Sequence, residues 1–305
     1  MAKIRTVLGD IFPHDFGLAL VHEHVLVDFI GADKFSKVRY DAKEVCDIML
    51  PYLVEIRRLG VTGFVECTPA YMGRDPKLLA NLSEAADIHI LMNTGLYKDP
   101  YLPRLASELS ADHLAELWIE EVDDGIEDTS VRAGFIKIAV NPGHIVPMQQ
   151  KIVKAAARCS LSTGAVIACH TASGVAAMEL LAILAEEGVD ANRLIVVHSD
   201  AEENTKYNFQ TAYRGAWVEY DGLNEKTAEK TLSLLRLMVK NGFEDYLLLS
   251  QDAGWYNVGE PCGGKIRCFE YLVKDFVPLM LAKGFSQKLV NKILVENPAK
   301  AFQMQ

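Results

Sequence analysis

Short apolar segments, several of them rich in Val and Ile, alternate with longer amphipathic segments along this chain of 305 residues. Each apolar segment has about the length of a buried β-strand. They lie at residues 18–27, 61–68, 89–97, 133–140, 165–171, 194–200, 216–222 and 246–254. The pattern therefore predicts eight strands.

The amphipathic segments carry start and stop signals of helices. Residues 41–60 begin with acidic side chains and end with basic ones and glycine, as helix ends prefer, and Pro51 could kink this helix. Residues 173–188 open on Ser173 as a candidate cap, and residues 224–242 have a similar pattern. A last helix is expected after Ser286.

Alternating strands and helices imply parallel strands joined by right-handed crossovers. Eight such units favour a closed (β/α)8 barrel over an open doubly wound sheet, and no G-x-G-x-x-G fingerprint follows the first strand. Before residue 18, the punctuation by Gly9, Pro13 and Gly17 predicts a short hairpin that caps the barrel. We expect an α/β fold in which residues 1–305 form one domain, a TIM barrel with an N-terminal hairpin and an extra C-terminal helix.

Composition narrows the class of protein further. The net charge of −10, with both signs interspersed, argues against a nucleic-acid partner. There is no apolar run long enough for a transmembrane helix and no secretory signal pattern, so we expect a cytoplasmic protein. None of the cysteines forms a C-x-x-C pair, and free thiols are expected, with Cys262–Cys268 as the alternative disulfide. The cysteines are Cys46, Cys67, Cys159, Cys169, Cys262 and Cys268.

The first predicted strand, LVHEHVLV, carries two histidines within an apolar run. Residues two apart in a strand share a face, so His22 and His24 project together and Glu23 points the other way. In a (β/α)8 barrel, catalytic groups lie at the carboxyl ends of the strands. Further polar residues occupy the ends of the fourth, fifth, sixth and eighth predicted strands: Lys137, His170, His198 and Asp252.

These imidazoles and the carboxylate are donors that zinc and similar divalent metals select. A single histidine on an apolar strand is usually a hydrogen-bonded core residue, but four at the ends of three strands favour a metal site. An ammonium at Lys137 would be repelled by metal ions, unless its amine has reacted with carbon dioxide to give a carbamate. The other histidines are expected to be structural or at the surface: His14, His89, His113 and His144.

Five motifs in order carry a family likeness: HEH, RAGFIKIA, HTASG, HSD and QD. Together they resemble the phosphotriesterase-like branch of the amidohydrolase superfamily, from the LVHEH strand to ENPAKAF near the C-terminus. The resemblance implies a binuclear centre, usually of zinc, and a homodimer. His22, His24 and Asp252 would hold the more buried metal, and His170 and His198 the more exposed one. Carboxylated Lys137 and a hydroxide would bridge the pair.

The resemblance also implies a hydrolytic mechanism, in which Asp252 acts as ligand and general base. Asp200, two residues after His198, is a candidate relay for the proton, with a loop cap as the alternative interpretation. Tyr97 matches a tyrosine that lines the lactone site of lactonase-like members. Their arginine after the seventh strand is absent, because this chain reads VEYDGL there with Tyr220 near that position.

The loop 253–271 after the eighth strand combines aromatic Trp255 and Tyr256 with basic Lys265 and Arg267. Loops at this end of a barrel set specificity, so these four residues are candidate substrate contacts, and the basic pair could accept an anionic group. Glu66 and Thr68 end the second strand without an assigned role. We expect a hydrolase of small-molecule lactones or other carboxylic esters, with a phosphotriesterase as the alternative. A non-catalytic binding protein is disfavoured because every metal-ligand position is filled.

Overall fold

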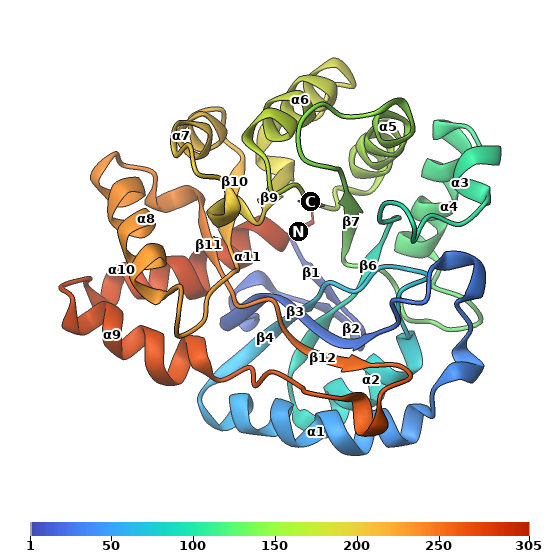
Figure 1. Ribbon diagram of the computed structural model, residues 1–305, viewed down its shortest axis with the longest axis horizontal. Coiled ribbons are helices and arrows are strands. Elements are labelled where there is room, and N and C mark those ends of the chain that lie inside the picture. The colour runs from blue at the N-terminus through green and yellow to red at the C-terminus, as the bar shows by residue number, and fades with distance from the viewer. Residues whose placement is uncertain (1, 305) are drawn as a thin grey trace.

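Two parallel sheets together form the wall of a barrel in the computed structural model, which describes residues 2–304. The order of strands is β11-β10-β9-β8-β7-β6 in one sheet and β12-β3-β4-β5 in the other. The chain passes between the sheets from β5 to β6 and from β11 to β12, which closes the ring and confirms the predicted (β/α)8 barrel (Figure 1). The strands are β3 (Leu18–Val27), β4 (Val61–Glu66), β5 (His89–Leu91), β6 (Asn93–Thr94), β7 (Phe135–Ala139), β8 (Ile167–His170), β9 (Leu194–Val197), β10 (Trp217–Tyr220), β11 (Leu247–Leu249) and β12 (Ala253–Asn257).

The eighth predicted strand, 246–254, is interrupted. Leu249 ends β11 and Ala253 begins β12, and the polar residues between them leave the ladder. Asp252 has a φ of 50°, in the left-handed region that non-glycine residues rarely adopt. The interruption lengthens the strand to Asn257, so part of the predicted loop 253–271 pairs in parallel with β3.

Helices surround the strands (Figure 1). Asp41 caps the first of them by accepting from the backbone N–H of Lys43 and Glu44, and the helix continues through Pro51. The last predicted helix before β11 begins at residue 228 instead of 224, because Asn224 and Thr227 form a turn. The helices are α1 (Ala42–Arg58), α2 (Pro76–Ala86), α3 (Leu105–Glu108), α4 (Ala111–Asp123), α5 (Pro147–Thr163), α6 (Gly174–Glu186), α7 (Lys206–Tyr213), α8 (Ala228–Lys240), α9 (Val277–Ala282), α10 (Gln287–Asn291) and α11 (Asn297–Phe302).

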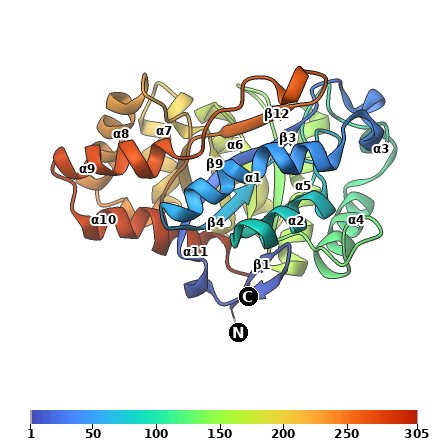
Figure 2. The ribbon, with the colours of Figure 1, turned by 90° about the horizontal axis from the view of Figure 1, so that it is seen from below.

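The predicted N-terminal hairpin is present as β1 (Ile4–Thr6) and β2 (Gly9–Ile11), which pair antiparallel. It lies beside both chain ends, at the side of the barrel opposite β12 (Figure 2). Lys3 bridges to Met304, and the N–H of Val7 donates to the carbonyl of Ile90 in β5. No helix within residues 2–304 has the length and hydrophobicity that crossing a bilayer requires.

Aromatic side chains fill the interior of the barrel at this hairpin end. The ring of Phe302, from α11, lies 6.5 Å from Phe16 and 5.5 Å from Phe135 between centroids, both edge to face. All three side chains are buried, together with apolar residues of several strands. The C-terminal helix thereby plugs one end of the barrel, which leaves polar chemistry to the other end.

We predict that Phe302→Ala lowers the free energy of unfolding by about 3–5 kcal/mol, because the substitution leaves a cavity among packed rings. Urea unfolding followed by circular dichroism measures this change. Phe302→Leu, which keeps most of the volume, should cost clearly less. Equal stability of the alanine variant and the native chain would contradict the role of this plug.

Candidate active site

All six predicted metal ligands line one pocket at the carboxyl ends of the strands: His22, His24, Lys137, His170, His198 and Asp252. The pocket encloses about 430 Å³ out to open solvent. His22 and His24 are 1% and 7% exposed, whereas His170 and His198 are only partly buried. His22 and His24 therefore lie deeper in the pocket than His170 and His198.

The ring of His24 faces the carboxylate of Asp252 in the pocket. Its Nδ1 lies 2.8 Å from the Thr68 hydroxyl, which in turn donates to Glu66 at 2.6 Å. Thr68 must accept from Nδ1–H, so a neutral His24 directs the lone pair of Nε2 outward. That nitrogen lies 3.0 Å from Asp252 Oδ1, a buried oxygen without a hydrogen-bond donor in residues 2–304. Two facing acceptors require a cation or a proton between them.

Together with His22, these two residues form a set whose ligand atoms lie within 4.8 Å of one another. Burial, then the charge of Lys137, lowers the pKa of His22 to about 3, and burial lowers that of His24. Both imidazoles are therefore neutral, the state that a metal ligand requires. For Asp252, burial raises the pKa, but the contacts with the imidazoles of His24 and His22 outweigh it, so the net shift is downward. The donor set fits a divalent metal ion.

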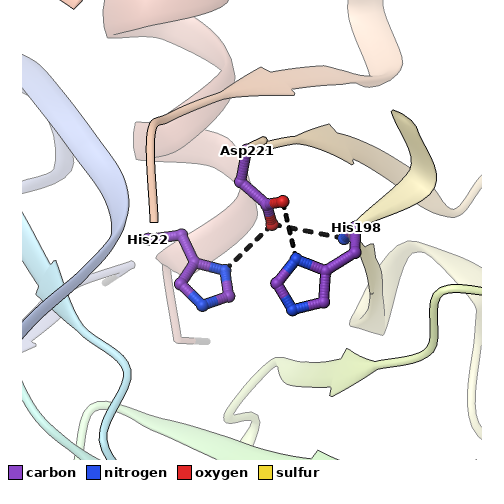
Figure 3. A group of neighbouring side chains, drawn as sticks. All are labelled: His22, His198 and Asp221. Carbon is purple, nitrogen blue, oxygen red and sulfur yellow. Dashed lines mark hydrogen bonds and ion pairs between the residues drawn. The ribbon is translucent and has the colours of Figure 1, made fainter. Parts of the chain in front are cut away.

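Asp221, which the sequence analysis did not select, orients one ring of each set (Figure 3). Its Oδ1 lies 2.6 Å from His198 Nδ1, and its Oδ2 lies 3.1 Å from His22 Nδ1. Glu219, two residues earlier on β10, lies 2.7 Å from the same His22 nitrogen. Both rings are thus held through Nδ1, which leaves Nε2 for the pocket. The period of two that revealed His22 and His24 also places Glu219 and Asp221 on one face.

The pKa values of these two acids shift in opposite directions. Burial and the charge of Asp221 raise the pKa of Glu219 well above its usual value. Burial acts in the same direction on Asp221, but the adjacent His198 and His22 outweigh it and lower the pKa of Asp221. For His198, burial lowers the pKa, and the Asp221 carboxylate outweighs it to give a net rise. Of the two acids, Asp221 is the one whose negative charge the rings of His22 and His198 stabilise.

Lys137 is 2% exposed and its Nζ lies 3.2 Å from His22 Nε2. Within residues 2–304, no ion pair joins this Nζ to a carboxylate. A buried ammonium without a counter-ion is costly. The position suits an amine that has been converted into an oxygen ligand.

His170 belongs to neither compact group of ligand atoms in the described chain. Its Nδ1 lies 2.9 Å from the hydroxyl of Tyr97, and its ring lies 4.5 Å from that of His198 between centroids. Burial, followed by the charge of His198, lowers the pKa of His170 to about 2, so the ring is neutral. Tyr97 therefore lies beside the more exposed set, in the pocket where the sequence predicted it.

Among the other predicted substrate residues, only Trp255 lines the pocket. Its ring lies 4.4 Å from His24 and 5.6 Å from Phe29 between centroids. Arg267 lies beside it but donates to the carbonyl of Asp252 at 2.9 Å. Tyr256 faces away from the pocket and donates to Glu44, because successive residues of β12 point to opposite faces. Lys265 is exposed and lies outside the pocket lining.

Asp200 does not have the geometry of the predicted proton relay. Its carboxylate accepts from the backbone N–H of Asp221 at 3.4 Å and of Gly222 at 3.0 Å. A side chain at Gly222 would overlap Asp200 Oδ2, so this contact depends on glycine. Burial, then the charge of Asp221, raises the pKa of Asp200 to about 6. The residue supports the end of β10 and does not line the pocket. Tyr220, named as the neighbour of the missing arginine, is buried and bonded to Asn208.

The sequence model of the Phosphotriesterase family matches residues 2–302. The chain is 30% identical over 292 residues to a phosphotriesterase homology protein of Escherichia coli (strain K12), which covers 94% of this chain and 98% of that one. It is 27% identical over 303 residues to an aryldialkylphosphatase of Saccharolobus solfataricus (strain ATCC 35092 / DSM 1617 / JCM 11322 / P2), covering 94% and 95%. A solved structure that concerns engineering of organophosphate hydrolysis from a weak promiscuous lactonase template superposes with a TM-score of 0.89, at 27% identity, over 98% of this chain and 99% of that one.

Since the family match spans almost the whole chain, the protein belongs to the phosphotriesterase family. The predicted resemblance is thereby confirmed, and the relatives include hydrolases.

We predict that Asp221→Asn weakens zinc binding by about 10–100-fold at both ligand sets. An amide has one acceptor oxygen and no charge, so it cannot orient the rings of both His22 and His198. Competition with a chromophoric chelator gives the affinity of each equivalent. Thr68→Val is the matched control, because Thr68 contacts the ring of His24 alone and should weaken a single equivalent. Loss confined to one equivalent in Asp221→Asn would contradict the shared role.

Proposed function

We propose that the protein is a binuclear metal-dependent hydrolase that cleaves a lactone or another carboxylic ester. The observation that carries the proposal is the pair of facing acceptors, His24 Nε2 and Asp252 Oδ1, 3.0 Å apart at the pocket floor. The Nδ1 atoms of His22, His24 and His198 are each hydrogen-bonded to a carboxylate or a hydroxyl. Such partners behind metal-binding imidazoles fix the tautomer that binds metal.

His22, His24 and Asp252 would hold the more buried ion, and His170 and His198 the more exposed one, with zinc as the metal we propose. Two bound cations would lower the pKa of a shared water towards neutrality and polarise the carbonyl oxygen of the ester. The side chain of Asp252, whose Oδ1 is otherwise unbonded, would accept the proton that water releases during attack. Asp200 is not included in this step, since both of its oxygens accept backbone N–H groups.

We further propose that Lys137 is carboxylated. In this step the amine nitrogen of Lys137 bonds to the carbon of carbon dioxide and releases a proton, which gives a carbamate anion. The product has two oxygens that can bridge two cations, and it removes the unpaired buried ammonium next to His22. Because buried carboxylates lie beneath the pocket, a further anion at Lys137 is stable only when metal cations are bound.

The pocket favours a neutral acyl compound. Its walls include Phe29, Met72 and Trp255, and the Tyr97 hydroxyl supplies a hydrogen-bond donor beside His170. Pockets that bind small molecules commonly combine apolar walls with a few polar groups in this manner. The basic side chains that could bind an anionic group, Lys265 and Arg267, lie outside the lining. A lactone with an apolar substituent therefore fits the walls better than a phosphorylated sugar lactone.

Phosphotriesterase activity is the alternative, and the similarity to an aryldialkylphosphatase supports it. A triester presents the same polarised oxygen but needs room for three substituents around phosphorus. The compact pocket and the similarity to an engineered lactonase template favour the carboxylic ester. Triester hydrolysis is then a side reaction of the same groups.

We propose a cytoplasmic homodimer. All six cysteines are free thiols, including the alternative pair Cys262 and Cys268, and free thiols persist in a reducing compartment. The homodimer rests on the resemblance to the family. Small-molecule esters are the proposed partners, and the negative net charge with both signs interspersed argues against nucleic acid.

A panel of neutral lactones, phosphorylated sugar lactones, aryl esters, N-acyl amides and phosphotriesters tests the proposal with zinc-reconstituted protein. We expect kcat/KM for neutral lactones or esters to exceed that for triesters at least a hundredfold, about 2.7 kcal/mol of differential transition-state binding. Asp252→Asn should remove most of this activity. A preference for triesters would establish the alternative, and absence of turnover across the panel would reject both.

We predict that Lys137→Ala loses at least one zinc equivalent and that millimolar short carboxylates restore part of it, since they supply the missing oxygens. Native protein grown with ¹³C-bicarbonate should show a carbamate signal by NMR that Lys137→Ala lacks. Lys98→Ala, at a half-buried lysine outside the pocket lining, is the control and should retain both the signal and the metal. Full metal content in Lys137→Ala without added carboxylate would exclude the bridging role.

A further inference from the structure

Glu23, the residue between the two histidines of β3, is fully buried on the face opposite to them. Its carboxylate accepts from four donors. Oε1 receives the Ser250 hydroxyl at 2.8 Å, the Gln251 N–H at 3.2 Å and the Gln251 side-chain amide at 3.4 Å. Oε2 receives the N–H of Ala253 at 2.6 Å. All four donors belong to the stretch in which the eighth strand is interrupted.

These bonds replace the strand ladder where it is missing. A buried N–H without an acceptor is costly, and the N–H groups of Gln251 and Ala253 bond the Glu23 side chain instead of a strand carbonyl. The Glu23 carboxylate accepts the N–H on each side of Asp252, while the N–H of Asp252 itself donates to the carbonyl of His22 at 3.0 Å. Residues of β3 thus accept from the backbone N–H groups of Gln251, Asp252 and Ala253.

The geometry of Asp252 needs such support. Its left-handed backbone, with a φ of 50°, is unfavourable for a residue with a side chain, and persists only where the surroundings fix it. This conformation directs Oδ1 to within 3.0 Å of His24 Nε2. The Trp255 indole and the Arg267 guanidinium donate to the backbone carbonyl of Asp252, but these bonds do not connect Asp252 to β3.

We propose that Glu23 is a positioning residue that sets Asp252 into the geometry of a metal ligand. The HEH segment then contributes three functions, since two rings bind metal and the residue between them places the carboxylate that completes their set. The inference rests on the metal centre of the proposed function. It concerns metal binding, so its test does not depend on the substrate.

The test is a double-mutant cycle on zinc affinity, with Glu23→Gln in the native background and in Asp252→Asn. An amide retains one acceptor oxygen and presents an N–H₂ to backbone donors, so the interruption should relax. We expect Glu23→Gln to weaken one zinc equivalent about tenfold or more in the native background, and to have little further effect once Asp252 is replaced. A purely structural loss would lower affinity equally in both backgrounds, and would overturn the proposal.

Glu66→Gln is the matched control, because Glu66 is an equally buried carboxylate that bonds Val25 and Thr68 instead of the interruption. Its effect passes through His24 and should persist in the Asp252→Asn background. Should Glu23→Gln fail to melt cooperatively, Ser250→Ala removes one of the four bonds, and its smaller loss should also vanish in Asp252→Asn. Native affinity in Glu23→Gln would overturn the inference. Native affinity of both equivalents in Asp252→Asn alone would instead reject the proposed metal centre.

Discussion

The mouth of this barrel buries more carboxylate than cation, and the remaining arrangement follows from that imbalance. Glu23, Glu66, Glu219 and Asp221 are each at most 1% exposed, and Lys137 is the buried cation whose charge reaches Glu66 and Glu219. Burial raises the pKa of Glu66 to about 7 and that of Glu23 to about 8. Buried acids of this kind are stable inside a protein only when they are protonated, paired, hydrogen-bonded or coordinated to metal.

The carboxylates divide into those that face the pocket and those that lie behind it. Asp252 presents an unbonded oxygen to the imidazoles, whereas Asp221, Glu66 and Glu23 use their oxygens on ring nitrogens, a hydroxyl or backbone N–H groups. Each supporting acid thus fixes the direction of a group that faces the pocket. This division explains how Glu23 and Glu66 can occupy strands whose other residues are mostly apolar.

Strand periodicity predicted the inward pair of histidines and the barrel, because both depend on spacing within one segment. The same rule applied to VEYD would have found Glu219 and Asp221, but acids at a strand end read equally well as solvated loop residues. The contact from Ser250 to Glu23 joins residues 227 positions apart, and no local pattern carries such a pairing. The interruption before Ala253 extended the last strand, so Tyr256 alternates away from the pocket whereas a loop could have brought it in.

The contact between Asp200 and Gly222 constrains how this pocket can diversify. Any Cβ at position 222 would overlap the Asp200 carboxylate that holds the end of β10, and Asp221, which orients two rings, is the adjacent residue. A larger residue at 222, an arginine included, therefore displaces the Asp200 carboxylate from the backbone N–H groups that it holds. A substitution at 222 therefore acts on the metal-facing rings at one remove, by loosening the support of Asp221, and positions 200 and 222 should vary together among related chains.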